Sequence, residues 1–160
     1  MNGPSEAAPQ PLSRRSVPRL YAIADADALA PRSIEAGVAE MAEAGVRWIQ
    51  LRAKGRSGLF WYRTLEAVCL SLAGSEVQLW IDDRADLAAL FPLAGLHLGA
   101  RDLPPEAARR VVGDGIRIGL STHDRGQLEA AAGNREVDLV AVGPVFATAS
   151  KADPDRKSVV

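Results

Sequence analysis

The chain has 160 residues, of which 48% are hydrophobic and 24% charged, and its net charge is −1. This length fits one domain with a buried core and is too short for two ordinary domains. A nearly neutral chain has no long-range attraction to nucleic acid or anionic membranes, and no apolar run approaches the ~18 residues that span a bilayer. We therefore expect neither partner.

The first 19 residues contain four prolines and no apolar segment typical of a secretory signal. They predict a flexible tail at 1–19 and a folded domain at 20–160. The single cysteine, Cys69, cannot form an internal disulfide, which suits a reducing cytoplasm.

From Leu20 onward, short apolar runs alternate with longer amphipathic segments. Ser33 is typical of a helix N-cap and Gly45 of the residue after a helix. The predicted strands are 20–24, 48–51, 78–81, 95–98, 117–120 and 138–142. The predicted helices between them are 33–44, 59–73, 84–90, 104–112 and 125–132.

Strands that are separated by helices run parallel, which indicates an α/β fold. The two candidate architectures are an open doubly wound sheet and a TIM (β/α)₈ barrel. No glycine-rich nucleotide-binding motif follows any strand, whereas polar groups follow five consecutive strands, as in a barrel whose site lies at the carboxyl ends of its strands. We predict the barrel type, with about six of its eight βα units.

Two carboxylates, Asp83 and Asp102, follow neighbouring strands and suit Mg²⁺, which binds one or two carboxylates together with substrate phosphate. The alternative is that Asp83 caps the helix at 84–90 and Asp102 the helix at 104–112. Asp82 could likewise form a local ion pair with Arg84.

The strand that ends at Gln50 is followed by Arg52 and Lys54, which suit an anionic leaving group or, alternatively, a solvated loop. Ser121 could contact phosphate or cap the following helix. His97 lies in an apolar strand and is expected in the core, as are Trp48, Trp61 and Trp80.

Taken in order, five motifs resemble the thiamine phosphate synthase family, whose near relatives are the thiazole tautomerases. The motifs are QLRAK (50–54), IDDRADLA (81–88), GLHLGARDLP (95–104), GLSTH (119–123) and AVGPVFATASK (141–151). The resemblance implies a barrel enzyme that joins hydroxymethylpyrimidine diphosphate to thiazole phosphate and releases diphosphate. Its substrates would be small molecules, and its cofactor would be Mg²⁺.

The resemblance also implies roles for single residues. Asp83 and Asp102 would hold Mg²⁺. Arg52, Lys54 and Lys151 would act on the diphosphate. The substrate-binding set would be Gln50, Arg52, Lys54, Asp82, Ser121, Thr148, Ser150 and Lys151.

The sequence departs from the family where Asp82 replaces the usual asparagine, which places a negative charge near the diphosphate unless Arg84 or a metal compensates. Ser150 replaces a threonine that is frequent in synthases. A tautomerase and an inactive fragment that binds phosphate ligands remain alternatives, but the retained Asp83 and Asp102 favour the synthase. Because eight strands complete such a barrel, we expect a C-terminally truncated form of a longer enzyme. A homo-oligomer that completes the barrel stays open.

Overall fold

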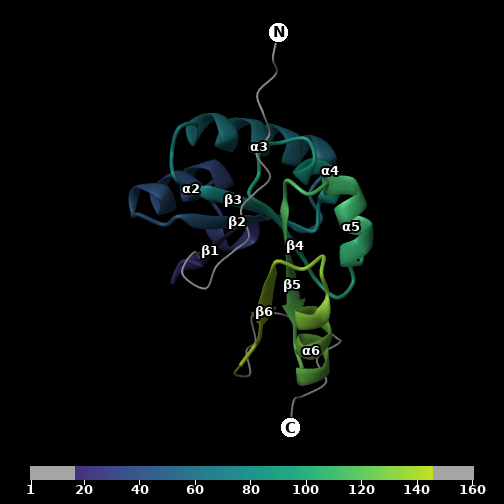
Figure 1. Cartoon of the computed structure of the whole chain (residues 1–160). Helices are drawn as coiled ribbons and strands as arrows, with labels where there is room; N and C mark the ends of the chain where they lie inside the picture. The colour runs from purple at the N-terminus through teal and green to yellow at the C-terminus, as the bar shows by residue number, and fades with distance from the viewer. Residues whose placement is uncertain (1–16, 146–160) are drawn as a thin grey trace.

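The computed structural model describes residues 17–145, which form one curled sheet of six parallel strands (Figure 1). Each strand pairs with the next one in the chain, in the order β1-β2-β3-β4-β5-β6. The strands are β1 (Tyr21–Asp25), β2 (Trp48–Arg52), β3 (Gln78–Asp82), β4 (Gly95–Leu98), β5 (Arg117–Thr122) and β6 (Leu139–Val142). The predicted parallel α/β arrangement is confirmed.

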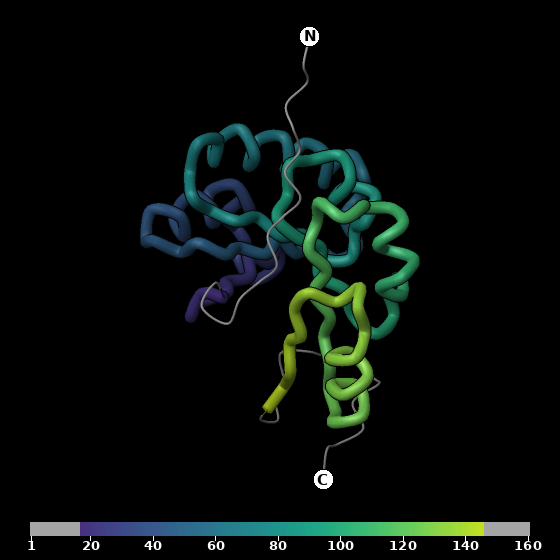
Figure 2. The backbone as a smooth tube through the Cα atoms, in the orientation of Figure 1, coloured from purple at the N-terminus to yellow at the C-terminus, as the bar shows by residue number. Residues whose placement is uncertain are grey.

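The helices lie on the outer side of this curve, and the chain winds steadily from β1 at one end of the sheet to β6 at the other (Figure 2). They are α1 (Ala26–Leu29), α2 (Ile34–Glu43), α3 (Gly58–Ser71), α4 (Ala85–Ala88), α5 (Pro105–Val112) and α6 (Arg125–Gly133). Sequential parallel strands with outer helices are the layout of a barrel, and here six strands form a partial one.

Local sequence explains most of the helix ends. Ser33 caps α2 by accepting from the Ala36 backbone N–H at 3.2 Å, and Gly45 follows the helix with a φ of +89°. The short helix α1 is absent from the sequence prediction. It begins where the Asp25 side chain accepts from the backbone N–H groups of Asp27 and Ala28.

The outer face of the sheet and the helices share the main apolar core. Side chains that point outward from β2 and β4, such as Leu51 and Leu96, are completely buried. They belong to one cluster with Val38 of α2 and with Leu65 and Val68 of α3. This layer fixes the strands and so positions their carboxyl ends.

The inner face of the curve is filled by aromatic rings. The ring centroids of Trp48 and Trp80 are 5.2 Å apart, and those of Tyr21 and Trp80 are 5.5 Å apart. Trp80 has no exposed surface, and a Cβ at Gly95 would lie only 2.2 Å from its ring. The tryptophans are therefore core residues as predicted, and a glycine on β4 makes room for one of them.

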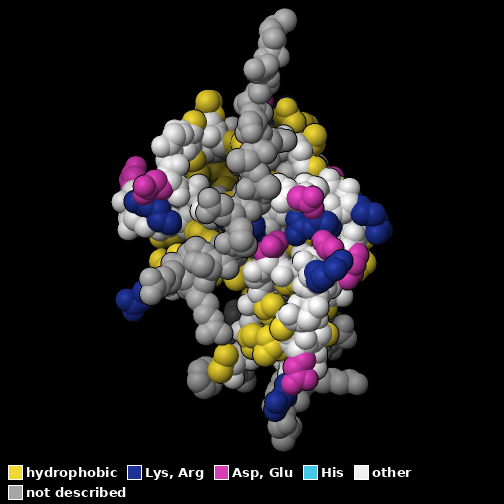
Figure 3. Space-filling view, in the orientation of Figure 1, with side chains coloured by type: hydrophobic (Ala, Val, Ile, Leu, Met, Phe, Trp, Pro, Cys, Tyr) yellow, Lys and Arg dark blue, Asp and Glu magenta, His cyan; other side chains and the backbone are white. Residues whose placement is uncertain are grey.

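The two edge strands leave apolar side chains in contact with solvent. Ile23 on β1 is 51% exposed and Val142 at the end of β6 is 57% exposed. Figure 3 shows apolar side chains on the surface near β6. Within residues 17–145, no helix has the length and apolar character needed to cross a membrane.

Candidate functional site

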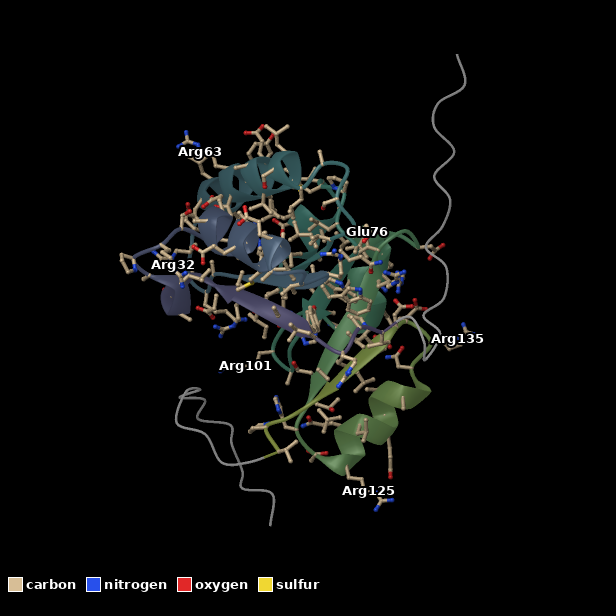
Figure 4. All side chains as sticks on the ribbon, turned by 90° about the vertical axis from the view of Figure 1, so that its left-hand side faces the viewer. Arg32, Arg63, Glu76, Arg101, Arg125 and Arg135 are labelled. Atoms are coloured by element: carbon tan, nitrogen blue, oxygen red, sulfur yellow. The ribbon has the colours of Figure 1, made fainter. Side chains whose placement is uncertain are left out.

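The predicted site residues that the structure describes gather at the carboxyl ends of the strands. Arg52 ends β2 directly opposite Asp25 at the end of β1, and Asp82 ends β3 opposite His97 on β4. By contrast, Arg32, Arg63 and Arg125 lie at the periphery of the molecule, as Figure 4 shows. The parallel register thus concentrates a particular set of charges at one rim.

Alternating charges link three strand ends in a row that we call the charge ladder, namely Asp25, Arg52, Asp82, Lys54 and Asp83. Arg52 Nη1 donates to Asp25 Oδ2, and its Nε lies 3.4 Å from Asp82 Oδ2. Lys54 Nζ lies 3.2 Å from the same Asp82 oxygen and donates to Asp83 Oδ2. Burial alone would lower the pKa of Lys54, but the carboxylates of Asp83 and Asp82 raise it. Lys54 is therefore held in its charged form, and both cations are paired with carboxylates.

The ladder rules out the alternative that Asp82 forms an ion pair with Arg84. Arg84 does not pair with it but turns to Asp86, with Nε 2.8 Å from Asp86 Oδ1. Instead, Arg52 and Lys54 share one oxygen of Asp82. The negative charge of Asp82, where the resemblance implies an asparagine, is thus compensated by the two cations that were expected to bind diphosphate.

Asp83 and Asp102 lie next to each other across β3 and β4. Burial, together with the neighbouring Asp83 carboxyl, raises the pKa of Asp102 even though its Oδ2 accepts from the Gly99 N–H at 2.7 Å. Asp83 takes a φ of +65°, in the left-handed region that few residues other than glycine adopt. Its Oδ1 is buried, and no group in residues 17–145 donates a hydrogen bond to it. The pair is crowded with negative charge and has an unused oxygen.

Neither aspartate caps a helix, so that alternative is wrong. The N-cap residues are Arg84 for α4 and Pro104 for α5, and neither helix has a side-chain cap bond. The backbone of Asp83 turns the chain out of β3 before α4 starts. Its carboxylate is consequently left at the rim.

The inner wall of the rim carries two further predicted residues. Gln50 is 3% exposed, and its Nε2 donates to no acceptor in the described part of the chain. Ser121 Oγ lies 2.9 Å from Nε2 of the buried His97. Ser121 does not cap the next helix, because Asp124 does so by accepting from Gln127 N–H at 2.8 Å. Gln50 and Ser121 thus present polar groups above the aromatic core.

Lys151, Thr148 and Ser150 lie outside the described residues, so their predicted roles stay predictions. Sequence reasoning missed Asp25, although it directly follows the first apolar strand, the same signal that identified Asp82 and Asp83. The prediction that His97 is buried in the core is confirmed. The sequence did not reveal that the His97 ring also contacts Ser121.

A shallow hollow of about 100 Å³ lies beside the ladder, between the loops that follow β2 and β3. Lys54, Asp82 and Asp83 reach it from the ladder, and Arg56 and Arg84 add two more cations to its wall. Positive groups on both loops make this side of the rim suitable for an anion.

The balance of positive and negative side chains indicates which ligands the rim can bind. Four carboxylates, those of Asp25, Asp82, Asp83 and Asp102, meet the cations of Arg52 and Lys54. Within residues 17–145 no cluster of three or more His, Cys, Asp or Glu side chains forms a complete metal site. Two carboxylates and an unused buried oxygen nevertheless suit a hard divalent cation that takes its other ligands from a phosphate-bearing substrate and water.

Comparisons with known proteins agree with this geometry. The family model described as thiamine monophosphate synthase matches residues 20–159. The chain belongs to this family. Thiamine-phosphate synthase from Koribacter versatilis is 42% identical over 146 residues, which cover 87% of this chain and 67% of the relative. The Pelotomaculum thermopropionicum thiamine-phosphate synthase is 41% identical over 116 residues, covering 72% of this chain and 53% of that protein.

A solved structure also matches the thiamine monophosphate synthase fold of this chain. Thiamine phosphate pyrophosphorylase from Pyrococcus furiosus superposes with a TM-score of 0.69 at 26% identity, covering 79% of this chain and 60% of that one. The predicted family and barrel type are confirmed. The chain spans about half to two thirds of the length of these relatives.

Proposed function

We propose that this chain carries the pyrimidine diphosphate half of a thiamine phosphate synthase site. The reaction would join hydroxymethylpyrimidine diphosphate to thiazole phosphate and release diphosphate. The observation that carries the proposal is the charge ladder beside Asp102, which offers cations for a diphosphate and carboxylates for a metal at one rim. Membership of the family supports the same activity.

The residues present fit Mg²⁺. Within residues 17–145 the buried Asp83 Oδ1 has no donor, and burial together with the adjacent Asp83 carboxyl raises the pKa of Asp102. A divalent cation would relieve both conditions, because it supplies positive charge where two carboxylates crowd together. Asp83 and Asp102 would hold it. When bound, it would neutralise charge that develops on the departing diphosphate.

The chain's own residues would bind and orient the anion. Arg52 and Lys54 are already held in place by carboxylates, so little reorganisation is needed when a diphosphate replaces part of that pairing. Gln50 offers a buried amide donor to the pyrimidine side of the substrate. The aromatic floor of Trp80 and Tyr21 excludes water below it. Lys151 would complete the cation set, as the resemblance implies.

The decisive experiment incubates the 160-residue chain with hydroxymethylpyrimidine diphosphate, thiazole phosphate and Mg²⁺, and measures thiamine phosphate and free diphosphate together. Equal amounts of both products, formed only with Mg²⁺, are the expected result. A rearranged thiazole phosphate without diphosphate would instead make the chain a tautomerase. Calorimetric binding of the pyrimidine substrate without any product would make it a binding fragment.

The proposal implies small-molecule substrates, and a cytoplasmic location is consistent with the one cysteine, Cys69, which is a free thiol. Whether copies of the chain associate stays a prediction to be tested by the size of the particle in solution.

A further inference from the structure

Asp25 occupies a position at the rim that the predicted site did not include. It is the last residue of β1, and its side chain is 18% exposed. One carboxylate oxygen, Oδ1, accepts from the backbone N–H groups of Asp27 at 2.9 Å and Ala28 at 3.3 Å. The other oxygen accepts from Arg52 Nη1. The start of α1 therefore fixes the carboxylate, and the carboxylate in turn fixes the arginine.

The guanidinium of Arg52 is held from two sides. Asp25 of β1 binds Nη1 and Asp82 of β3 faces Nε at 3.4 Å, so the group is suspended across three neighbouring strands. A guanidinium has five N–H donors, and the described part of the chain gives this one no other hydrogen bond. Donors are left over for an anion.

Fixing a long side chain such as that of arginine costs conformational entropy. Because Asp25 orders Arg52 during folding, that cost does not fall on substrate binding. The contact differs from the one made by Asp82, whose single oxygen is shared between Arg52 and Lys54 at 3.2 to 3.4 Å. Among the residues that the structure describes, Asp25 pairs with Arg52 alone.

We propose that Asp25 is a positioning residue that holds the Arg52 guanidinium ready for the anionic leaving group. This inference rests on the proposed function for the identity of the anion. Two simpler roles compete with it. Asp25 could serve only to cap α1, or it could act only through its negative charge at the rim.

Four variants of the whole 160-residue chain separate these roles. Asp25→Asn removes the carboxylate that holds Arg52 but keeps the cap, since asparagine caps helices as well as aspartate does. Arg52→Gln removes the guanidinium, and the double variant removes both groups. Asp124→Asn is the matched control, because Asp124 caps α6 in the same way through Gln127 N–H and no arginine in residues 17–145 pairs with it.

The readout is calorimetric binding of inorganic diphosphate in the presence of Mg²⁺. We expect Asp25→Asn to weaken binding about tenfold in the wild-type background and less than about twofold in the Arg52→Gln background, because residues that act as a unit are not additive. Asp124→Asn should leave binding unchanged. Equal losses in both backgrounds would overturn the proposal. So would tighter binding in Asp25→Asn, which is what a purely electrostatic role predicts.

A second readout does not depend on the proposed function. The ¹⁵N Nε–H signal of Arg52 reports how rigidly the guanidinium is held in the free protein. It should be ordered in the wild type and in Asp124→Asn, and should lose order in Asp25→Asn. If the wild type fails to bind diphosphate, the proposed function is wrong. The Arg52 signal then decides by itself whether Asp25 positions Arg52. An Arg52 that is equally ordered without the Asp25 carboxylate would overturn the positioning role.

Discussion

At the scale of single residues, the carboxylate of Asp83 lies so close to that of Asp102 that it disfavours the ionised form of Asp102. Burial and the adjacent Asp83 carboxyl raise the pKa of Asp102, so two negative charges side by side are unfavourable here. The Gly99 N–H still holds the Asp102 carboxylate in place. A site arranged in this way gains most from a bound cation.

The Asp102→Asn variant should therefore lose Mg²⁺-dependent turnover by at least about 100-fold. The asparagine oxygen can still accept from Gly99 N–H, so the fold should persist, and circular dichroism should be unchanged. Steady-state turnover against Mg²⁺ concentration is the measurement. Asp114→Asn, on an exposed turn away from the rim, is the control. Unchanged turnover in Asp102→Asn would remove Asp102 from the metal site.

Asp25 carries a prediction about acid stability. Burial opposes ionisation of its carboxyl, but the Arg52 hydrogen bond and the backbone N–H groups of Ala28 and Asp27 outweigh burial and lower the pKa below 3.8. A group with a lowered folded pKa binds fewer protons when folded. Its stabilising effect is complete above the unfolded pKa and is lost as the pH falls through the lower folded value.

Urea unfolding of the wild type and Asp25→Asn between pH 7 and pH 2 tests this sign. At pH 7 the wild type should be more stable by about 1.5 to 3 kcal/mol, the range of a hydrogen bond to a charged group. The two stabilities should converge below pH 3.8. Parallel curves over the whole range would show that the Asp25 carboxyl contributes no ionised pairing.

At the scale of elements, the packing of β3 against β4 and β5 depends on one large side chain and two glycines. Trp80 of β3 fills the inner face and pairs in register with Gly95 on β4. On the next pair of strands, His97 of β4 pairs in register with Gly119 on β5. A Cβ at Gly95 would lie 2.2 Å from the Trp80 ring, and one at Gly119 would lie 2.7 Å from His97 Nδ1. The strands can pair only because these side chains are absent.

Gly95→Ala should consequently lower the free energy of unfolding by about 1 to 3 kcal/mol, the usual range for overpacking a core. Thermal or urea unfolding measures it. The same change at Gly115, where a Cβ meets no atom within 4 Å, should alter stability by less than about 0.5 kcal/mol. If the collision is the cause, Gly95→Ala should cost less when Trp80 is replaced by leucine. An equal cost in both backgrounds would refute it.

At the scale of the whole molecule, β1 and β6 are the edge strands of the curled sheet, and within residues 17–145 each pairs with a strand on one side only. Parallel strands are normally covered on both faces, and exposed edges pair readily with other chains. Here Ile23 of β1 is 51% exposed beside the aromatic inner face. The relatives are longer than this chain, which spans about half to two thirds of them.

The 160-residue chain should therefore bind an apolar dye such as anilinonaphthalene sulfonate in its native state. Ile23→Thr should reduce the dye fluorescence clearly. Leu70→Thr should not, although Leu70 is 78% exposed, because it lies on α3 and not on the inner face of the sheet. A native chain with no dye fluorescence, or equal loss in both variants, would show that the inner face is covered.

Much of this molecule could be predicted from the sequence because the signals are local. The order of strands and helices follows from hydrophobic period, and Ser33 and Gly45 mark helix ends by their own backbone chemistry. The site residues Arg52, Asp82 and Asp83 could be found because each closely follows or ends an apolar strand, and parallel strands bring such positions to one rim. The short helix α1 could not be predicted, because four residues are too few to show a helical repeat of apolar side chains.

Only the tertiary structure decided which of these charges meet. Asp25 and Arg52 are 27 residues apart, and Lys54 and Asp83 are 29 apart, so nothing in either local sequence selects the partner. Register selects it, and the shared outer core of the helices fixes the register. The same holds for Asp82, whose charge the sequence showed but whose compensation by Arg52 and Lys54 depends on neighbouring strand ends. The sequence determined which chemistry is present at the rim, and packing over long separations determined how it is arranged, because side-chain pairing there is set by strands that meet only in the folded chain.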